Sequence, residues 1–242
     1  MLKILQVNEN KTDTISTKKS SFRDSISYNK FLMKNKYVNF ISDEHLLKCI
    51  ANLHKAYLKA KNNITKKNFY TNKVDTIKLT FDAKFNDIDE ESLIQAEILR
   101  QIDKSINNSI GTFHEQILGG INGFEVGNLS GFDIKADDNT LFALLIFSEL
   151  PINFEEAIFE KLDKQANLYK NSNCYLVDFT LENHYLEKWV IASDERSVSH
   201  KRVFKISANN FYFLLSKKEN ALDNLIEKTN KLFVTFENSK FF

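Results

Sequence analysis

The stretch Gly131-Phe-Asp-Ile-Lys-Ala-Asp-Asp-Asn-Thr-Leu-Phe-Ala-Leu-Leu-Ile-Phe147 decides the fold of this 242-residue chain. A short apolar–acid alternation is followed by Asp-Asp-Asn, a strong turn signal, and then by seven apolar residues from Leu141 to Phe147. So short a run between turn residues is typical of a strand covered on both faces, although a buried helix is the competing interpretation. The stretch predicts a core hairpin, with Asp133 near the end of its first strand.

The composition excludes several classes of protein. A hydrophobic content of 43% supports a buried core, and no apolar run approaches the roughly 20 residues of a membrane span. The net charge of +1 does not indicate a polyanion partner, so any such site is a local patch. Cys49 and Cys174 lie far apart without metal-ligand spacing. We expect a soluble, cytoplasmic protein with no membrane partner.

Residues 1–36 are predicted to form a polar, basic arm, which can touch phosphate or simply be a solvated tail. Helices are expected from Ser42, from Asp89 to about Asn107, and from Ile110 to Leu118. Thr76 to Phe81 alternates between polar and apolar residues, which favours a strand or an extended connection.

Beyond the hairpin, helical and strand patterns alternate. The pattern predicts a helix after Pro151, a buried strand at Cys174–Phe179 with a hairpin partner at Tyr185–Ala192, a short strand at Val203–Ile206, and helices at Ser207–Leu215 and Ala221–Leu232. This order predicts an α/β (α+β) fold in which a mixed central sheet is flanked by helices. Residues 37–242 are expected to be a single domain, mainly helical over 37–108 and with its sheet-containing core over 109–242.

Several segments resemble a known family. They are Val74–Asp82, Glu97–Lys104, Ile110–Leu118, Gly131–Asp133, Phe159–Gln165, Cys174–Val177 and His200–Ser207 with Phe211-Tyr212. In their order and spacing they resemble type II restriction endonucleases that cut GGNCC-type sites, within the PD-(D/E)xK nuclease superfamily. The resemblance covers roughly Tyr37 to Leu232 and implies a mixed sheet with flanking helices, which agrees with the pattern above.

The resemblance also implies a metal site. In such nucleases an Asp at a strand end and a Glu on the next strand hold Mg²⁺ against the scissile phosphate, and a Lys two residues after the Glu helps to position water. Asp133 matches the first acid and is the expected metal ligand. The Glu and Lys positions are occupied here by Leu144 and Ile146, neither of which offers a metal ligand or a charge.

Other residues are candidates to support the chemistry. Glu97 and Glu115 are helix acids that could face the site, and His114 is carried over from the resemblance; each also has an ordinary structural interpretation. Lys161 and Lys164 could lend a charge, whereas Glu149 would need a slipped register. Six residues are candidate DNA contacts: Lys164, Gln165, His200, Lys201, Arg202 and Lys205. For the last four, an exposed edge strand protected by charge is the alternative.

The resemblance implies a type II site-specific deoxyribonuclease of a restriction–modification system that hydrolyses DNA phosphodiesters with Mg²⁺. Double-stranded DNA is the expected partner, together with a cognate DNA methyltransferase and a second copy in a homodimer. A catalytically degenerate relative that binds DNA without cutting it is the alternative, because of Leu144 and Ile146. A globular α/β protein that retains only the fold is a third possibility.

Overall fold

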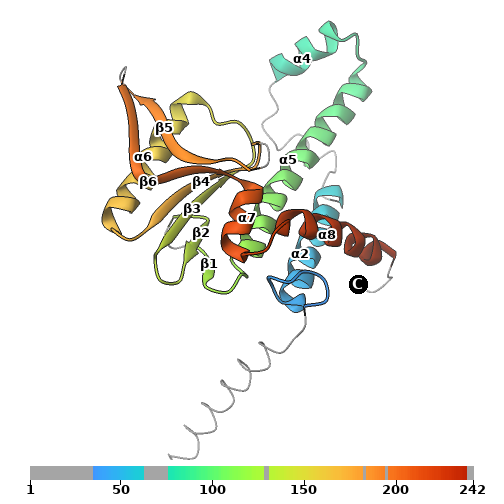
Figure 1. Cartoon of the computed structure of the whole chain (residues 1–242). Coiled ribbons are helices and arrows are strands. Elements are labelled where there is room, and N and C mark those ends of the chain that lie inside the picture. The colour runs from blue at the N-terminus through green and yellow to red at the C-terminus, as the bar shows by residue number, and fades with distance from the viewer. Residues whose placement is uncertain (1–34, 63–75, 128–130, 182–183, 194–195, 239–242) are drawn as a thin grey trace, which may run out of the picture.

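The computed structural model describes residues 35–62, 76–127, 131–181, 184–193 and 196–238 (Figure 1). Within them lie the helices α2 (Asp43–Asn62), α4 (Thr76–Phe85), α5 (Glu90–Leu118), α6 (Ile152–Leu168), α7 (Ala208–Ser216) and α8 (Ala221–Asn238). The strands are β1 (Phe124–Val126), β2 (Ile134–Ala136), β3 (Leu141–Ile146), β4 (Asn173–Asp178), β5 (Leu186–Ser193) and β6 (Arg196–Ser207). The basic arm predicted for residues 1–36 lies almost wholly outside the described residues.

The strands form one mixed sheet in the order β1-β2-β3-β4-β6-β5. The central strands β3, β4 and β6 are parallel, and the remaining pairs are antiparallel. The hairpin predicted from residues 131–147 is confirmed as β2 and β3, and the turn contains Asn139 in the left-handed conformation (φ 60°). The predicted α+β class, with a helical N-terminal region before the sheet, is also confirmed.

Helices cover both faces of this sheet and bury a separate apolar cluster on each (Figure 1). The larger cluster joins α2, α5, α7 and α8 to one face, with Ile117, Ile134, Val177 and Phe211 among its members. The smaller cluster lies between α6 and the other face and includes Phe142, Leu162, Leu176 and Trp189. Strands buried on both faces explain the long apolar runs of β3 and β4.

The helical part before the sheet differs from prediction in two places. Residues 90–118 form the single 29-residue helix α5 and not two helices, since Gly111 is accommodated inside it against the ring of Phe147. The strand or extended connection predicted at Thr76–Phe81 is wrong, because these residues begin helix α4. Ile77 and Phe81 are four residues apart, a helical spacing that the alternating pattern also satisfies.

The pairing of the last strands also differs from prediction. β5 forms a hairpin with β6 and not with β4, and β6 is twelve residues long. The short connection between Ser193 and Arg196, which are paired in register, explains this choice. β6 lies inside the sheet from Val203 to Ser207, where it also pairs with β4, so the interpretation as edge protection is wrong for Lys205. His200, Lys201 and Arg202 precede the residues that pair with β4. None of the described helices is long and apolar enough to cross a membrane.

Candidate active site at the carboxyl edge of the sheet

Asp133 is fastened to the carboxyl-terminal half of β3. Its backbone N–H donates to the carbonyl of Ala143 at 3.0 Å, and its Oδ2 accepts a 2.6 Å hydrogen bond from the N–H of Leu145. Its carbonyl accepts from the N–H of Gly127 at 3.0 Å. Burial raises the pKa of Asp133, while the Leu145 N–H and the nearby Lys161 oppose that rise. This carboxylate therefore has a fixed position beside β3.

Leu144 and Ile146 belong to β3 and lie beside Asp133, which is hydrogen-bonded to that strand. The partner of Leu144 in the sheet is Leu176, and that of Ile146 is Asp178. Both side chains pack, half-buried, against the cluster under α6. At this register the side chains of Leu144 and Ile146, at the expected Glu and Lys positions, form an apolar surface.

Glu115 faces this edge from α5, on the opposite side of the sheet. It lies between two glycines at helical spacing: a Cβ on Gly111 would be 3.3 Å from the Phe147 ring, and one on Gly119 would be 2.6 Å from Val126 Cγ2. Residues four apart share one face of a helix, so Glu115 also faces the sheet. Burial, followed by the charge of Asp133, raises the pKa of Glu115. The two carboxylates therefore lie close enough for their charges to interact.

Lys161 reaches the same place from α6. Its ammonium donates to the carbonyl of Gly131 and lies 5.0 Å from the centre of the Phe132 ring. Gly131 has a φ of 75°, a conformation that glycine adopts without strain. A cation is thus held at Gly131, two residues before Asp133, and its charge opposes the rise in the pKa of that carboxyl.

His114 belongs to an aromatic cluster. Its Nδ1 lies 2.8 Å from the hydroxyl of Tyr212, and its ring packs against Phe147 and Phe179 at centroid distances of 5.7 and 4.6 Å. Burial lowers the pKa of His114 to about 4 and raises that of Tyr212 well above its usual value. A neutral imidazole therefore shares a hydrogen bond with the tyrosine hydroxyl, and this arrangement gives His114 a packing role.

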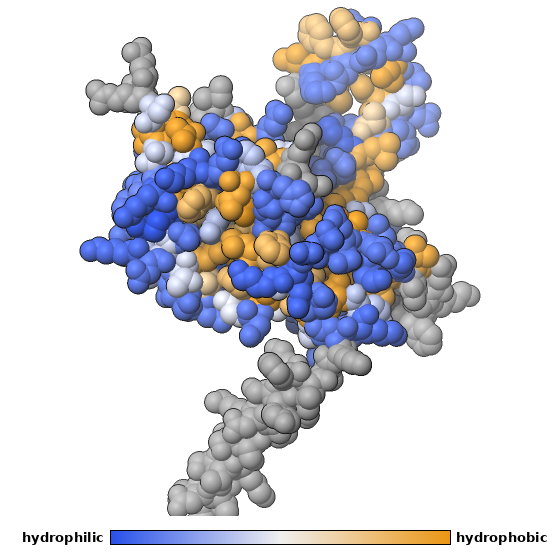
Figure 2. Space-filling view, in the orientation of Figure 1, coloured by the Kyte–Doolittle hydropathy of each residue, from blue (hydrophilic) through white to orange (hydrophobic). Residues whose placement is uncertain are grey.

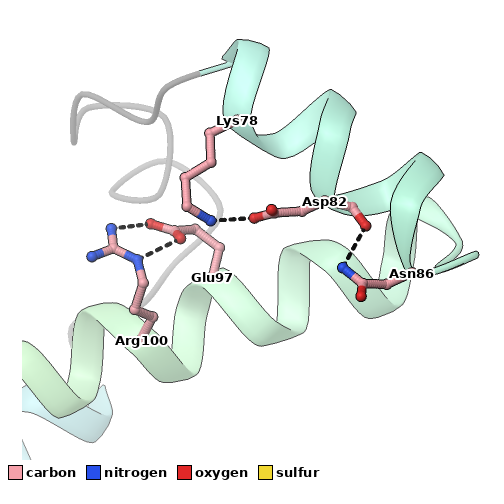
Figure 3. Close-up of polar contacts among 5 residues, drawn as sticks. All are labelled: Lys78, Asp82, Asn86, Glu97 and Arg100. Carbon is pink, nitrogen blue, oxygen red and sulfur yellow. Dashed lines mark hydrogen bonds and ion pairs between the residues drawn. The ribbon is translucent and has the colours of Figure 1, made fainter.

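Glu97 lies away from the candidate site. It precedes Glu115 by 18 residues on one continuous helix, which at about 1.5 Å per residue separates them by roughly 27 Å. Its carboxylate accepts hydrogen bonds of 2.7 and 2.6 Å from Arg100 (Figure 3). The expectation that Glu97 could face the site is wrong, because it depended on two separate helices.

The basic residues of β6 do not form one DNA-facing cluster. Arg202 donates to the carbonyls of Ser172, at 3.0 Å, and Ala166, at the amino end of the parallel strands. His200 Nδ1 accepts from the Arg202 N–H at 3.1 Å. Lys205 lies three residues after Arg202 and forms a 3.0 Å ion pair with the buried Asp178. Of these four basic residues of β6, Lys201 has an exposed side chain and the other three are half-buried.

Two of the candidate DNA contacts, Lys164 and Gln165, lie on α6. Lys164 pairs with Glu160 at 3.0 Å, and both side chains are exposed. Gln165 is half-buried, and its carbonyl accepts from the N–H of Tyr169. Neither residue is as close to Asp133 as Lys161, which the sequence offered only as a possible source of charge.

Asp178 is a feature that sequence reasoning missed. It ends β4 beside Ile146 and receives hydrogen bonds from the Thr180 N–H and hydroxyl at 2.8 and 2.7 Å. Burial alone would raise the pKa of Asp178, but Thr180 and Lys205 more than offset that effect and lower it. The available signal was an acid at the end of an apolar strand, the same signal that identified Asp133.

The donor set does not fit the expected Mg²⁺ ligands. Mg²⁺ requires oxygen ligands, and Leu144 supplies none at the position of the second acid. Among the described residues there is no group of three or more His, Cys, Asp or Glu side chains that could hold a metal. Asp133 and Glu115 lie at this edge on opposite sides of the sheet, and the third carboxylate there, Asp178, is already paired with Lys205.

Comparisons with known proteins agree on a single family. The model of the Eco47II restriction endonuclease family matches residues 38–234. The type II restriction enzyme Sau96I of Staphylococcus aureus is 35% identical over 206 residues, which cover 80% of this chain and 78% of that enzyme. The type II restriction enzyme Eco47II of Escherichia coli is 31% identical over 107 residues, or 44% of each chain. The matched region includes the whole sheet and the edge at Asp133.

Proposed function

The chain belongs to the Eco47II restriction endonuclease family, and from that premise we propose that it binds double-stranded DNA at a GGNCC-type site with its hydrolytic step strongly weakened. It acts as a homodimer within a restriction–modification system, beside a cognate DNA methyltransferase. The observation that carries the proposal is the apolar pair Leu144 and Ile146, in register beside the fixed carboxylate of Asp133.

The expected loss is large. Removing one preorganised electrostatic group from an active site typically costs roughly 2.7–4 kcal/mol, or two to three orders of magnitude in rate. Here both the second acid and the lysine are replaced, so the losses affect the metal and the attacking water together. DNA binding depends on other surfaces, mainly on cations that meet phosphates, and is expected to persist.

The test combines two measurements on the full chain. Plasmid DNA with GGNCC sites is incubated with the protein and Mg²⁺, and a duplex with one such site is titrated in a gel-shift assay against a scrambled duplex. We expect a specific shift with little or no cleavage. Efficient fragmentation at GGNCC sites would refute the weakened step, and equal affinity for both duplexes would refute specific recognition.

A second candidate, residual Mg²⁺-dependent hydrolysis, is favoured by one observation: Glu115 and Lys161 converge on Asp133 from opposite faces of the sheet. Mg²⁺ often uses only one or two carboxylates and completes its coordination with waters and substrate phosphate. Slow cleavage that disappears in both Glu115→Gln and Asp133→Asn would support this candidate. Slow cleavage that survives both substitutions would exclude it.

A further inference from the structure

A helical hairpin projects from the body of the protein (Figure 1). It consists of α4 and the first half of α5, and each helix carries polar contacts among its own side chains (Figure 3). Lys78 pairs with Asp82, and the 7%-exposed Glu97 is bound by Arg100 and Gln101. The hydrogen bond from Arg100 lowers the pKa of Glu97, with Lys78 contributing a smaller effect. The charges between the two helices therefore neutralise one another.

The outer side of this hairpin carries an apolar stripe. Ile77, Phe81 and Phe85 follow one another at intervals of four residues along α4, so they share one face of the helix. They are 69%, 69% and 90% exposed, and Leu99 on α5 is 64% exposed. Figure 2 shows the hydrophobic residues gathered over the projecting hairpin. Single exposed apolar residues are ordinary, whereas a continuous stripe that includes two phenylalanines indicates an interaction surface.

DNA is a poor occupant of this stripe. The tip of the hairpin, Asp87–Glu91, carries four carboxylates and no cation, and would repel phosphates. The apolar side chains also offer nothing to a phosphate backbone. The stripe therefore suits an apolar protein surface, bound so that the carboxylates of that surface lie away from the acidic tip.

We propose that the stripe Ile77–Phe81–Phe85 packs against the same stripe of a second copy of this chain, antiparallel across a two-fold axis near Phe81. The stripe is self-complementary in that arrangement, with Ile77 of one copy opposite Phe85 of the other. The antiparallel direction places the two acidic tips at opposite ends of the contact, whereas a parallel one would bring eight carboxylates together.

The available area is close to what such a contact requires. The exposed parts of the three stripe residues amount to roughly 450 Å² per copy, given that a fully exposed aromatic residue offers on the order of 200 Å². Pairing would then bury roughly 900 Å² in total, close to the lower limit of about 1,000 Å² for a specific interface. This inference rests on the homodimer in the proposed function and assigns a surface to it.

The test measures the mass of the full chain by analytical ultracentrifugation, from about 1 to 100 µM, the range in which an interface of this size dissociates. We expect a dimer that Phe81→Asp converts to a monomer with unchanged helix content by circular dichroism. The control is Phe154→Asp, which places the same charge at a 55%-exposed phenylalanine on α6 and leaves the dimer intact. If Phe81→Asp unfolds, Phe85→Asp at the 90%-exposed position replaces it.

A cross-link supplies a second readout. In Phe81→Cys the two new thiols meet near the proposed axis, so mild oxidation should give a disulfide-linked dimer, while Cys49 and Cys174 are buried and remain unlinked. A wild-type monomer across the whole range, or a Phe81→Asp protein that stays dimeric, would overturn the assignment. A Phe81→Asp protein that stays dimeric and still shifts the GGNCC duplex would overturn this surface alone, and an intact wild-type dimer that binds no DNA would overturn only the proposed DNA recognition.

Discussion

The carboxylate of Asp133 accepts a 2.6 Å hydrogen bond from the backbone N–H of Leu145, between the two residues that replace the expected Glu and Lys. This hydrogen bond fixes the carboxylate of Asp133, which lies outside β3, against that strand. The other half of the expected metal site is apolar. The side chains of Leu144 and Ile146 pack on the α6 side. They can be exchanged for polar ones because this half of the strand is only half-buried.

The double variant Leu144→Glu/Ile146→Lys is expected to bind Mg²⁺. The new carboxylate would lie beside Asp133 and complete a two-acid ligand set, with the lysine two residues later on the same face. Isothermal titration calorimetry should detect Mg²⁺ binding that the wild-type protein lacks, and cleavage of plasmid DNA should rise. The matched control Leu144→Gln/Ile146→Met changes polarity without charge. Equal Mg²⁺ affinity in both variants would show that this strand register does not form the site.

Lys205 is expected to support stability and not DNA affinity. Its ammonium pairs with Asp178, whose side chain is 5% exposed, so Lys205→Gln leaves a buried carboxylate without its cation. Loss of one partner of a buried pair costs about 3 kcal/mol. Because the folded-state pKa of Asp178 is lowered, the stabilisation from this pair should be full above pH ~4 and disappear as the pH falls through the folded pKa. Urea unfolding at pH 7 and pH 3 measures the difference.

The comparison variant is Lys161→Gln, at the edge beside Asp133. Lys161 has an exposed side chain there, so its loss should weaken DNA binding at all sequences and reduce the salt slope by about one, with little effect on unfolding. Lys205→Gln should leave the slope unchanged. If Lys205→Gln alone lowered the slope, the original expectation of a DNA contact at this residue would be restored.

The hairpin could be predicted from sequence because local chemistry determines it: three turn residues separate two segments, and Asn139 adopts the left-handed conformation that its residue type tolerates. The pairing of β5 was not predictable from its own residues, since it depends on the neighbour that the short Ser193–Arg196 connection brings alongside. Arg202 illustrates the same limit. Its acceptors, Ser172 and Ala166, lie 30 and 36 residues away, so sequence showed a charge but not its role.

Glu115→Gln is expected to stabilise the protein while removing any residual metal affinity. Burial and the charge of Asp133 raise the pKa of Glu115, so its ionisation is costly in the folded state. A raised acid pKa removes stability as the pH rises from the unfolded-state value through the folded-state value. The variant should therefore gain up to about 1 kcal/mol at pH 7 and nothing at pH 3. A loss of stability at pH 7 would show that the Glu115 carboxylate has a favourable partner.

His114 is expected to make the protein sensitive to mild acid. Burial lowers its pKa to about 4, whereas an unfolded histidine titrates near 6.5, so the unfolded state binds more protons between these values. Stability should therefore be greatest above pH ~6.5 and decrease by up to about 3 kcal/mol as the pH falls towards 4. Urea unfolding across this range measures the slope.

The control for His114 has to avoid creating a new buried polar group. His114→Phe alone would leave the Tyr212 hydroxyl without the hydrogen-bond partner that it now has at 2.8 Å, so the control is the double variant His114→Phe/Tyr212→Phe. Both rings fit a cluster that already contains Phe147 and Phe179. The double variant should lose most of the slope between pH 4 and 6.5. An unchanged slope would mean that other groups set the acid sensitivity and that His114 is not held neutral.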